Sequence, residues 1–409
     1  MAMTEPEDRT AYIKPSGRRS ALAGYTVLDL SQVRAGPTCA KQFADFGARV
    51  IKVEPPETAG RPELYVGPRN GPDMANLHRN KRSIALDLKS PIGREVLMQL
   101  VRQADVLLEN FRPDVKARLG FDYESLVAVN PRIVLVSISG FGQAGPYRTR
   151  PGFDQILQGM CGLMSTTGAP DGPPMRAGAA VIDVISGVYA ALGAMTALLE
   201  RETSGKGQWV QISLLHAGFG LMDFQAARYL YDGTVPGRTG NDHPTSMPTS
   251  AYRTKDGYIN IGAGGDKMWR ALCEAIGRPS VAADPDYATD ADRVRNREKL
   301  NRFLGHCFCE RSTAEWLQIL GENDVPAGPI YSMDQAFADP QVADAGIVAE
   351  VPGADGATRR ILGQVVQLSR TPANIEHLLE AKGASTDRIL AEIGYDPAQI
   401  ARLHEQGVV

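Results

Sequence analysis

One carboxylate stands out because nearly all residues around it are apolar. Asp183 lies near the start of an apolar stretch from Gly178 to Ala191 that contains no lysine or arginine. A buried acid is costly unless it has partners or a function. Near the first turn of a helix, the helix dipole favours an ionised Asp, which can attack a carbonyl carbon; an Asp there can also simply cap the helix. The stretch alone leaves both roles open.

Other reactive residue types are arranged less specifically. The five cysteines and six histidines show no metal-ligand spacing, and Cys307 and Cys309 lack a second ligand pair nearby, so we expect no metal site. Gly262, Gly264 and Gly265 follow an expected strand but lack the full Gly-x-Gly-x-x-Gly spacing of a dinucleotide site. A tight turn accounts for these glycines equally well.

The composition is that of a globular protein. A chain of 409 residues, with 43% hydrophobic and 22% charged residues, is large enough for more than one domain. The net charge is −3, and lysines and arginines are spread along the sequence, so we expect no nucleic-acid partner. An odd number of scattered cysteines favours a reducing compartment, and we expect a cytoplasmic protein.

Two segments resemble targeting or membrane signals only superficially. Residues 1–20 are polar and have no apolar run behind them, which predicts a flexible tail and not a secretory signal. Residues 177–199 are about long enough to span a bilayer, but Asp183 would be costly inside it. We therefore expect a buried core helix in this segment and no membrane partner.

Short β-branched runs alternate with helical stretches over residues 21–229. Helices are expected at Pro37–Phe46, which Gly47 closes, and at Pro91–Gln103, which has proline at its first position. This order predicts an α/β fold with a Rossmann-like, doubly wound parallel sheet in a large domain. The strands are expected at residues 26–30, 49–53, 83–88, 105–109, 133–138 and 209–214.

The pattern changes near residue 230. Two short strands, at 251–254 and 258–263, are joined by a Lys-Asp-Gly turn, which is a hairpin signal. Several helices follow, and one of them begins at a capping box that starts with Ser312. We expect a smaller α+β domain at residues 230–332, and a return of residues 333–409 to complete the large domain.

A series of short motifs from about residue 22 onwards, together with Asp183, occurs in the order typical of one enzyme family. Each motif is weak alone, but nine or ten in the right order are highly specific. They are Val27-Leu-Asp-Leu, Ala35-Gly-Pro, Phe46-Gly-Ala-Arg-Val-Ile-Lys-Val-Glu, Asn80-Lys-Arg-Ser, Glu109-Asn-Phe-Arg-Pro, Ser139-Gly-Phe-Gly, Pro151-Gly-Phe-Asp, Gly205-Lys-Gly-Gln, Asp256-Gly-Tyr and Val325-Pro-Ala-Gly-Pro. The chain resembles the class III CoA-transferases of the CaiB/BaiF type, which include formyl-CoA, carnitine and succinyl-CoA:dicarboxylate CoA-transferases and the α-methylacyl-CoA racemases.

The resemblance implies a specific active site. It implies that Asp183 is the nucleophile, that CoA or acyl-CoA enters as a substrate with no permanently bound cofactor, and that a carboxylic acid is the second substrate. It also implies ring-like subunits that thread through one another in an interlocked homodimer. Carried over by position, the CoA-binding residues are Val33, Arg34, Ala35, Lys81, Asn110, Phe111, Arg118, Ser139 and Gly140. Most of them follow the carboxyl ends of expected parallel strands, where open α/β sheets bind ligands.

The implied chemistry is a two-stage exchange on Asp183. The carboxylate attacks the acyl-CoA thioester to give a mixed anhydride, and the released CoA thiolate then forms an aspartyl-CoA thioester. An acceptor acid repeats these steps in reverse. Water must be kept out, and backbone N–H groups must hold the developing oxyanions. Gly140, Gly142 and Gly145 are the candidates for this close backbone approach.

One motif separates the two activities of the family. The racemases have a histidine in a Gly-His-Asp motif where this chain has Gly152, Phe153 and Asp154. Phe153 cannot exchange a proton, so we favour CoA transfer over racemisation or epimerisation. A catalytically silent acyl-CoA-binding protein is the third alternative, and the presence of Asp183 argues against it. Asp154 is expected to cap the helix that follows it.

Arg34 is where we expect substrate selectivity. The formyl-CoA enzymes have a glutamine at its position and a glycine-rich loop where this chain has residues 241–248, which disfavours oxalate as the acceptor. Because arginine binds carboxylates bidentately, Arg34 is a candidate to receive a carboxylate of a dicarboxylic acid or its CoA ester. The alternative is that Arg34 pairs with a CoA phosphate or a nearby acid.

Overall fold

The computed structural model describes residues 20–57, 67–353 and 355–409. They form two compact units. Unit 1 contains the described residues up to Gly162 together with residues 177–227 and 343–409, and unit 2 contains residues 163–176 and 228–342. The flexible tail expected at residues 1–20 lies, except for Ser20, outside the described residues.

The observed units differ from the expected domains in two places, although the boundary expected near residue 230 lies close to the observed one. Residues 163–176 belong to unit 2 and not to the large domain. Gly240 N donates to Gly168 O at 3.0 Å, so this segment is held by loop backbone groups, which leave no periodic signal in a sequence. Residues 333–342 also stay in unit 2, and only the residues after them return to unit 1.

Unit 1 is built on a six-stranded, fully parallel sheet with the order β3-β2-β1-β4-β5-β6. The strands are β1 (Thr26–Asp29), β2 (Arg49–Glu54), β3 (Lys81–Ala85), β4 (Val106–Glu109), β5 (Val134–Ser139) and β6 (Trp209–Ser213). Val27 on β1 pairs with Val50 on β2 and with Val106 on β4, so the strand order reverses between β1 and β4. The predicted α/β class, the doubly wound order and all six strands are confirmed.

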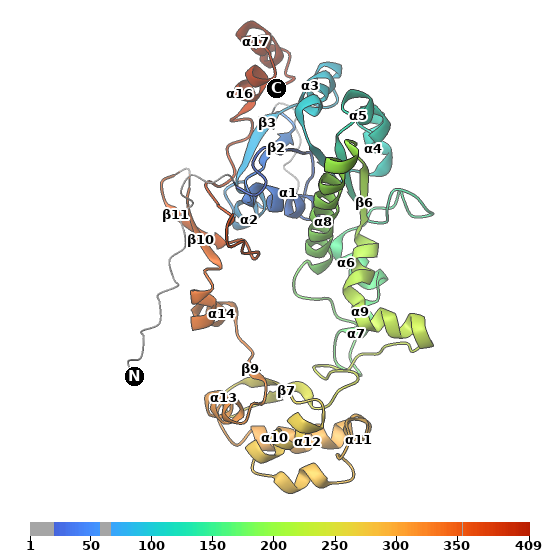
Figure 1. Ribbon diagram of the computed structural model, residues 1–409, viewed down its shortest axis with the longest axis vertical. Helices are drawn as coiled ribbons and strands as arrows, with labels where there is room; N and C mark the ends of the chain where they lie inside the picture. The colour runs from blue at the N-terminus through green and yellow to red at the C-terminus, as the bar shows by residue number, and fades with distance from the viewer. Residues whose placement is uncertain (1–19, 58–66, 354) are drawn as a thin grey trace. The chain divides into compact units, whose positions relative to one another are not determined.

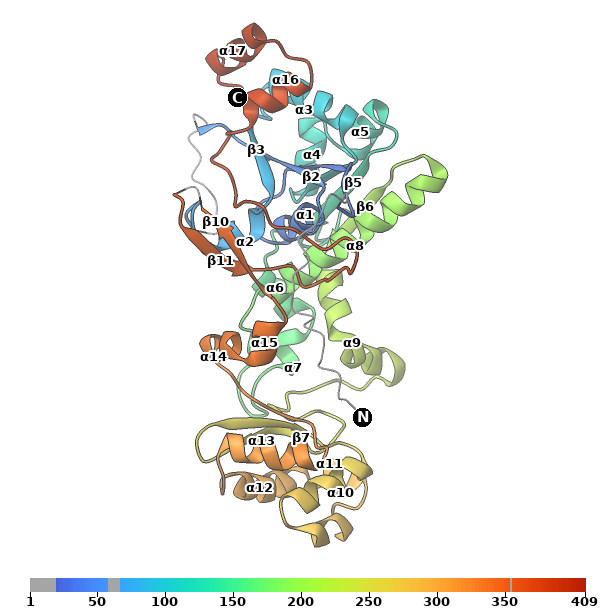
Figure 2. The same ribbon diagram turned by 60° about the vertical axis from the view of Figure 1, so that its left-hand side comes forward.

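Helices cover both faces of this sheet (Figures 1 and 2). Because successive strand residues point to opposite faces, Leu28 and Leu107 face one helix layer while Val27 and Val106 face the other. The helices of the first layer pack into the same hydrophobic core as Leu28. They include α3 (Pro91–Gln103), α5 (Tyr123–Val129), α16 (Thr386–Glu392) and α17 (Pro397–Glu405). The second layer contains α1 (Ala35–Asp45), which contacts β1, β2 and β4, and α8 (Val181–Ser204), which contacts β5 and β6.

The remaining helices and strands of unit 1 are short or lie at its edges. They are α2 (Pro72–His78), α4 (Pro113–Leu119), α6 (Asp154–Met160), the part of α9 (Leu214–Asp232) up to Ala227, and the antiparallel hairpin of β10 (Val348–Pro352) and β11 (Thr358–Leu362). Arg79 connects the hairpin to the helices, because its guanidinium is fully buried, pairs with Asp45 on α1 and donates to the carbonyl of Leu362.

Unit 2 is a small α+β structure around its own core. An antiparallel sheet of β7 (Thr249–Arg253), β8 (Tyr258–Gly262) and β9 (Ala327–Pro329) packs against helices whose core includes Trp269, Phe308 and Trp316. The expected hairpin and the capping box at Ser312 are confirmed. The helices are α7 (Leu163–Thr166), α10 (Asp266–Ala275), α11 (Asp290–Arg295), α12 (Arg297–Phe308), α13 (Thr313–Glu322), α14 (Met333–Ala338) and, in part, α15 (Pro340–Asp344), with a 3-10 turn at Pro279–Ala283.

Helix α8 is the apolar segment that has the length of a membrane span. Among the described helices it alone is long and apolar enough to cross a bilayer by length and composition. It lies against α1 and the sheet (Figure 2), and residues such as Ala190, Ala194 and Leu198 are buried there. One side of α8 therefore packs into the core as expected, whereas Val184, Val188, Leu192 and Leu199 on this helix are exposed.

The close contact of α8 with α1 depends on a glycine. A Cβ at Gly187 would lie 2.5 Å from the carbonyl oxygen of Ala35 and 2.6 Å from Cβ of Thr38, so only glycine allows this approach. The contact joins the start of α1, which follows β1, to the first two turns of α8. It therefore fixes the position of Asp183 relative to the residues after β1.

We expect Gly187→Ala to destabilise unit 1 by about 1–3 kcal/mol, because the added methyl group must push backbone and side chain apart. Urea unfolding followed by far-UV circular dichroism measures this loss. Gly305→Ala is the matched control, since a Cβ at this helical glycine of α12 meets no atom within 4 Å. The control should be neutral or slightly stabilising. Equal effects of the two substitutions would contradict the packing argument.

Candidate active site

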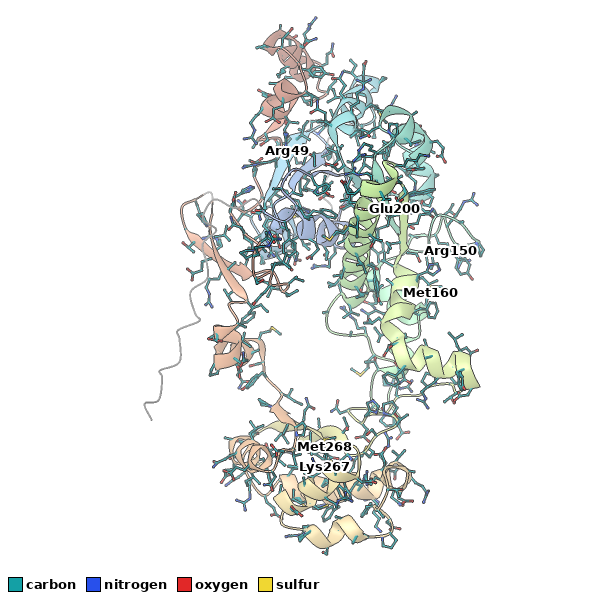
Figure 3. The ribbon with its side chains drawn as sticks, in the orientation of Figure 1. Arg49, Arg150, Met160, Glu200, Lys267 and Met268 are labelled. Atoms are coloured by element: carbon teal, nitrogen blue, oxygen red, sulfur yellow. The ribbon has the colours of Figure 1, made fainter. Side chains whose placement is uncertain are left out.

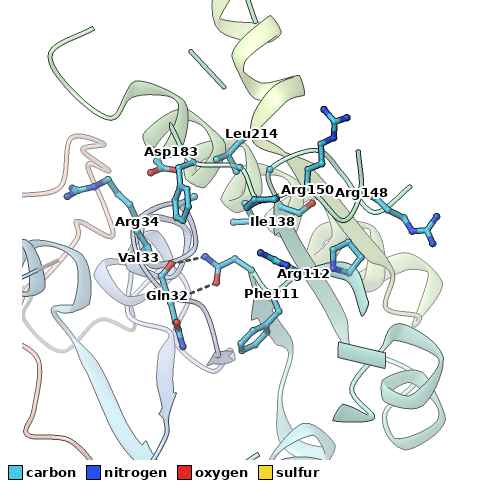
Figure 4. A pocket seen from close by; sticks show the side chains of 18 residues that line it. Gln32, Val33, Arg34, Phe111, Arg112, Ile138, Arg148, Arg150, Asp183 and Leu214 are labelled. Atoms are coloured by element: carbon cyan, nitrogen blue, oxygen red, sulfur yellow. Dashed lines mark hydrogen bonds between the residues drawn. The ribbon is translucent and has the colours of Figure 1, made fainter. Parts of the chain in front are cut away.

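The loops after β1, β4 and β5 meet at one pocket in unit 1 (Figure 4). The pocket lies where the strand order reverses, which is the usual place for a ligand in an open α/β sheet. The first turn of α8 also reaches it. The lining residues are Gln32, Val33, Arg34, Ala35, Asn110, Phe111, Arg112, Pro113, Ile138, Ser139, Gly140, Arg148, Arg150, Pro151, Gly152, Phe153, Asp183 and Leu214.

The loop after β1 is anchored by a buried ion pair. Asp29, the last residue of β1, accepts a hydrogen bond from Lys81 Nζ at 2.8 Å and one from the backbone N–H of Ser31 at 3.0 Å. Both charged side chains are fully buried. Burial alone would raise the pKa of Asp29, but the charges of Lys81 and Lys52 lower it below its ordinary value. Lys52 also donates to the carbonyl of Ser31 at 3.2 Å, so two cations hold this loop.

The next residues of this loop are held by Asn110. Its side-chain oxygen accepts from Gln32 N at 2.9 Å, and its side-chain nitrogen donates to Gln32 O at 2.7 Å, as the dashed lines in Figure 4 show. Val33 follows with φ of 65°, a strained conformation for a β-branched residue. The Asn110 amide therefore clamps the β4 loop to the β1 loop directly beside the strained residue.

A second buried network supports the loops after β4 and β5. Glu109 accepts from the backbone N–H of Phe111 at 2.8 Å and pairs with Lys116, which also donates to the side chain of Gln143. Burial raises the pKa of Glu109, and the Lys116 charge opposes this shift. Gln143 in turn donates to Ser139 Oγ at 3.3 Å. These contacts thereby connect the loop after β4 to the loop after β5.

Asp183 lies in the first turn of α8, half-buried at the wall of the pocket. Burial raises the pKa of its carboxyl, the neighbouring Asp154 charge raises it further, and the Arg34 guanidinium opposes both effects, so that the pKa is about 6. The carboxylate is therefore largely ionised at neutral pH. It is also more basic than an ordinary aspartate, and this combination suits a nucleophile.

Arg34 lies beside Asp183 but is not free. Its guanidinium donates to Asp73 on α2 at 2.9 Å, and the two side chains are 25% and 43% exposed. Of the two roles considered for Arg34, the structure shows the pair with a nearby acid. A half-exposed ion pair contributes little stability, about 0–1 kcal/mol, so another carboxylate can compete for this guanidinium.

Comparisons with known proteins identify a family for this chain. Residues 22–378 match the sequence model of CoA-transferase family III. The chain belongs to this family. The match confirms the family expected from the ordered motifs, and the chain is an enzyme that transfers CoA.

Individual relatives of this family III CoA-transferase match over most of their length. It is 38% identical over 385 residues to the succinate–glutarate CoA-transferase of Agrobacterium fabrum, covering 92% of this chain and 96% of the relative. It is 34% identical over 408 residues to the human succinyl-CoA:glutarate CoA-transferase, covering 99% and 92%. A crystal structure of a CaiB/BaiF family protein from Brucella suis has a TM-score of 0.80 and 34% identity, covering 92% of this chain and all of that one.

The pocket brings together most of the residues that the motifs singled out in this CoA-transferase. Lys81 does not line it, because its ammonium group is fully buried and pairs with Asp29. Arg118 is exposed on α4 and does not line the pocket. The residues that do line it are Val33, Arg34, Ala35, Asn110, Phe111, Ser139, Gly140 and Asp183.

The sequence reasoning missed three arginines of the pocket. Arg112 stands inside one of the ordered motifs, directly after Phe111, and could have been found there. Arg148 and Arg150 precede the Pro151 motif and extend outward in Figure 4, on the side opposite Arg34. Together the three give the pocket a positive rim that suits a ligand with phosphate groups. Among the described residues, no group of three or more His, Cys, Asp or Glu side chains could hold a metal ion.

The raised pKa of Asp183 predicts a pH-dependent stability effect. The folded protein holds this proton up to a pH of about 6, whereas the unfolded chain releases it near 3.8, so ionisation favours unfolding as the pH rises between these values. Asp183→Asn should therefore raise the unfolding free energy at pH 7.5 by roughly 1–3 kcal/mol. At pH 4 it should leave that energy unchanged. Chemical denaturation at both pH values tests this, and equal changes at the two would contradict it.

Proposed function

We propose that this enzyme moves CoA from an acyl-CoA donor such as succinyl-CoA to a dicarboxylic acid, through covalent intermediates on Asp183. The observation that carries the proposal is the place of Asp183: an ionisable carboxylate of raised pKa at the wall of a pocket with a positive rim. Family membership supplies the reaction class. The geometry supplies the residue that can perform it.

Each half-reaction is a pair of acyl exchanges. A carboxylate oxygen of Asp183 attacks the thioester carbonyl, the CoA thiolate leaves, and a mixed anhydride remains on the enzyme. The thiolate then attacks the aspartyl carbonyl, which gives an aspartyl-CoA thioester and releases the donor acid. The acceptor carboxylate attacks this thioester, forms its own anhydride with Asp183, and receives CoA when the thiolate attacks the acceptor carbonyl. Asp183 is then a free carboxylate again, and no net proton is consumed.

The pocket favours these exchanges in two ways. Partial burial keeps water from the anhydride, which would otherwise hydrolyse. Backbone N–H groups near Asp183 can stabilise the oxyanions. Of the three glycines considered for this role, Gly140 lines the pocket, whereas Gly142 N already donates to Ser139 Oγ at 3.1 Å and Gly145 lies outside it. We therefore assign the oxyanion role to Gly140.

The acceptor class is supported by Arg34 and by the relatives. The two relatives described above act, by their names, on succinate and glutarate, which carry two carboxylates. Arg34 is a cation close enough to Asp183 to influence its pKa. A substrate whose first carboxylate reacts at Asp183 can place its second on Arg34 and displace Asp73. Phe153, also at the pocket, has no proton to exchange, so the racemase reaction gains no support.

The oligomeric state of the enzyme is also part of the proposal. We propose an interlocked homodimer, supported by an exposed apolar stripe on α8 formed by Val184, Val188, Leu192 and Leu199. Met160 on α6, labelled in Figure 3, is exposed as well. A monomer mass in sedimentation equilibrium would contradict the dimer. We further propose that CoA acts only as a substrate and that the enzyme is cytoplasmic; none of the five cysteines, all of which the structure describes, forms a disulfide.

Trapping the intermediate tests the mechanism. After incubation with succinyl-CoA, hydroxylamine should convert the aspartyl-CoA thioester to a hydroxamate on the peptide that contains Asp183, and mass spectrometry should locate it. Asp183→Asn should give no adduct and no transfer. Asp122→Asn, which alters a capping Asp of α5 away from the pocket, should react normally. An unmodified Asp183 together with deuterium uptake next to the thioester would indicate racemisation, and CoA binding without either result would indicate a silent protein.

The assignment of Arg34 to the second carboxylate has its own test. Arg34→Gln should raise KM for glutarate about tenfold or more, because a charge-assisted contact is lost, and should change KM for a monocarboxylate such as butyrate much less. A change in kcat common to both acceptors would report only the effect of Arg34 on Asp183. Asp73→Asn is the complementary variant and should lower KM for glutarate. An equal rise in KM for both acceptors would rule the assignment out.

A further inference from the structure

Helix α8 begins without a cap of its own. Its N-cap residue is Ala180, which has no side chain that could accept a hydrogen bond. The first backbone N–H groups of a helix lack intrahelical partners and are costly to bury. In this enzyme they are satisfied from another helix: Asp154, the first residue of α6, accepts from Ile182 N at 2.8 Å and from Asp183 N at 3.2 Å. Asp154 was expected to cap α6, but its carboxylate caps the helix of the nucleophile.

The second oxygen of Asp154 is also fixed. It accepts from Gln158 Nε2 at 2.6 Å, and Gln158 is fully buried and accepts from Ala177 N at 2.9 Å through its other side-chain atom. All partners of Asp154 are N–H donors, so a residue that only accepts hydrogen bonds fits this position. Asp154 is only 8% exposed, which prevents water from replacing it.

This arrangement places a second carboxylate behind the nucleophile. The charged groups that act on Asp183 are Asp154 on α6 and Arg34 before α1, and they act in opposite directions. The rim arginines Arg112, Arg148 and Arg150 line the same pocket. The negative charge of Asp154 is stabilised where it lies, because it faces the positive end of the α8 dipole.

We propose that Asp154 is a positioning residue for the nucleophile. It holds the main chain of Asp183 by a hydrogen bond, and it places a fixed negative charge next to the Asp183 carboxylate. The hydrogen bond sets the direction in which Asp183 enters the pocket. The charge makes the carboxylate of Asp183 more basic and thus a better attacking group. This proposal rests on the proposed function of Asp183.

The variant Asp154→Asn separates the two contributions. The Asn side-chain oxygen still accepts from Ile182 N and Asp183 N, but the charge is gone and the hydrogen bond from Gln158 Nε2 to the second oxygen is lost with it. We expect the acid limb of the kcat/KM profile for CoA transfer to move to lower pH by about one unit, because the like-charge interaction is lost. We also expect kcat at neutral pH to fall while KM for acyl-CoA changes less than about twofold. Asp154→Ala removes the cap as well and should in addition lower the melting temperature.

Asp122→Asn is the matched control for this test. Asp122 is also a capping Asp of unit 1, since it accepts from Ser125 N at 3.0 Å at the start of α5, but it does not line the pocket. This control should lose a little stability and leave the acid limb in place. If Asp154→Asn lowers only stability and leaves the acid limb where it is, Asp154 is merely structural and the proposal is wrong.

A readout independent of activity keeps the two proposals distinguishable. Aspartate labelled with 13C at the side-chain carboxyl allows the titration of Asp183 to be followed by NMR, with Asp183→Asn identifying its signal. In the wild type this signal should titrate at a pH of about 6, and in Asp154→Asn at a lower pH. Identical titrations would overturn the role of Asp154. If the titration of Asp183 shifts in Asp154→Asn but the wild-type protein transfers no CoA, the role of Asp154 is upheld and the proposed function is refuted.

Discussion

The buried pair of Asp29 and Lys81 is the interaction on which the site depends. It joins the end of β1 to the start of β3, two strands that are separated by β2 in the sheet. A Cβ at Gly36 would lie 2.2 Å from Cβ of Ser31, so the chain after Asp29 turns back very tightly before α1 begins. Loss of one partner of such a pair would leave an uncompensated buried charge, at a cost of about 3–5 kcal/mol. The position of the pocket thus rests on charges that do not line it.

Asp183 and the arginine beside it come from different elements of unit 1. Asp183 is carried by α8, while Arg34 is carried by the loop after β1, and the glycine contact between α1 and α8 brings them together. Opposite effects on one carboxylate, from Asp154 and Arg34, leave it ionised yet basic. Neither neighbour alone would give this balance, since a lone cation would make the Asp183 carboxylate less basic and a lone anion would favour its protonation.

Much of the fold could be predicted because it has a local signal. The six strands of unit 1 are apolar runs of the expected length, and Ser312 begins a capping box. Eight of the ten predicted site residues line one pocket: seven lie at or just after the ends of the neighbouring parallel strands β1, β4 and β5, and Asp183 lies in the first turn of α8. Lys81 could not be placed, since a motif does not tell whether a strand residue faces the core or a ligand. The partner of Arg34 and the true role of Asp154 depend on contacts 39 and 28 residues away, which no periodicity records.

The last helices have a consequence for how the chain is made. Ile389 and Leu390 on α16, and Ile400 and Leu403 on α17, belong to the same core as Leu28 of β1. On the ribosome, β1 to β6 emerge first. The apolar residues of α16 and α17 cannot pack against them until these helices have left the exit tunnel. Unit 2, whose core lies between residues 247 and 325, is synthesised in the meantime and can fold first. The core of unit 1 is therefore complete only after α16 and α17 have been made, and until then the nascent sheet exposes apolar surface.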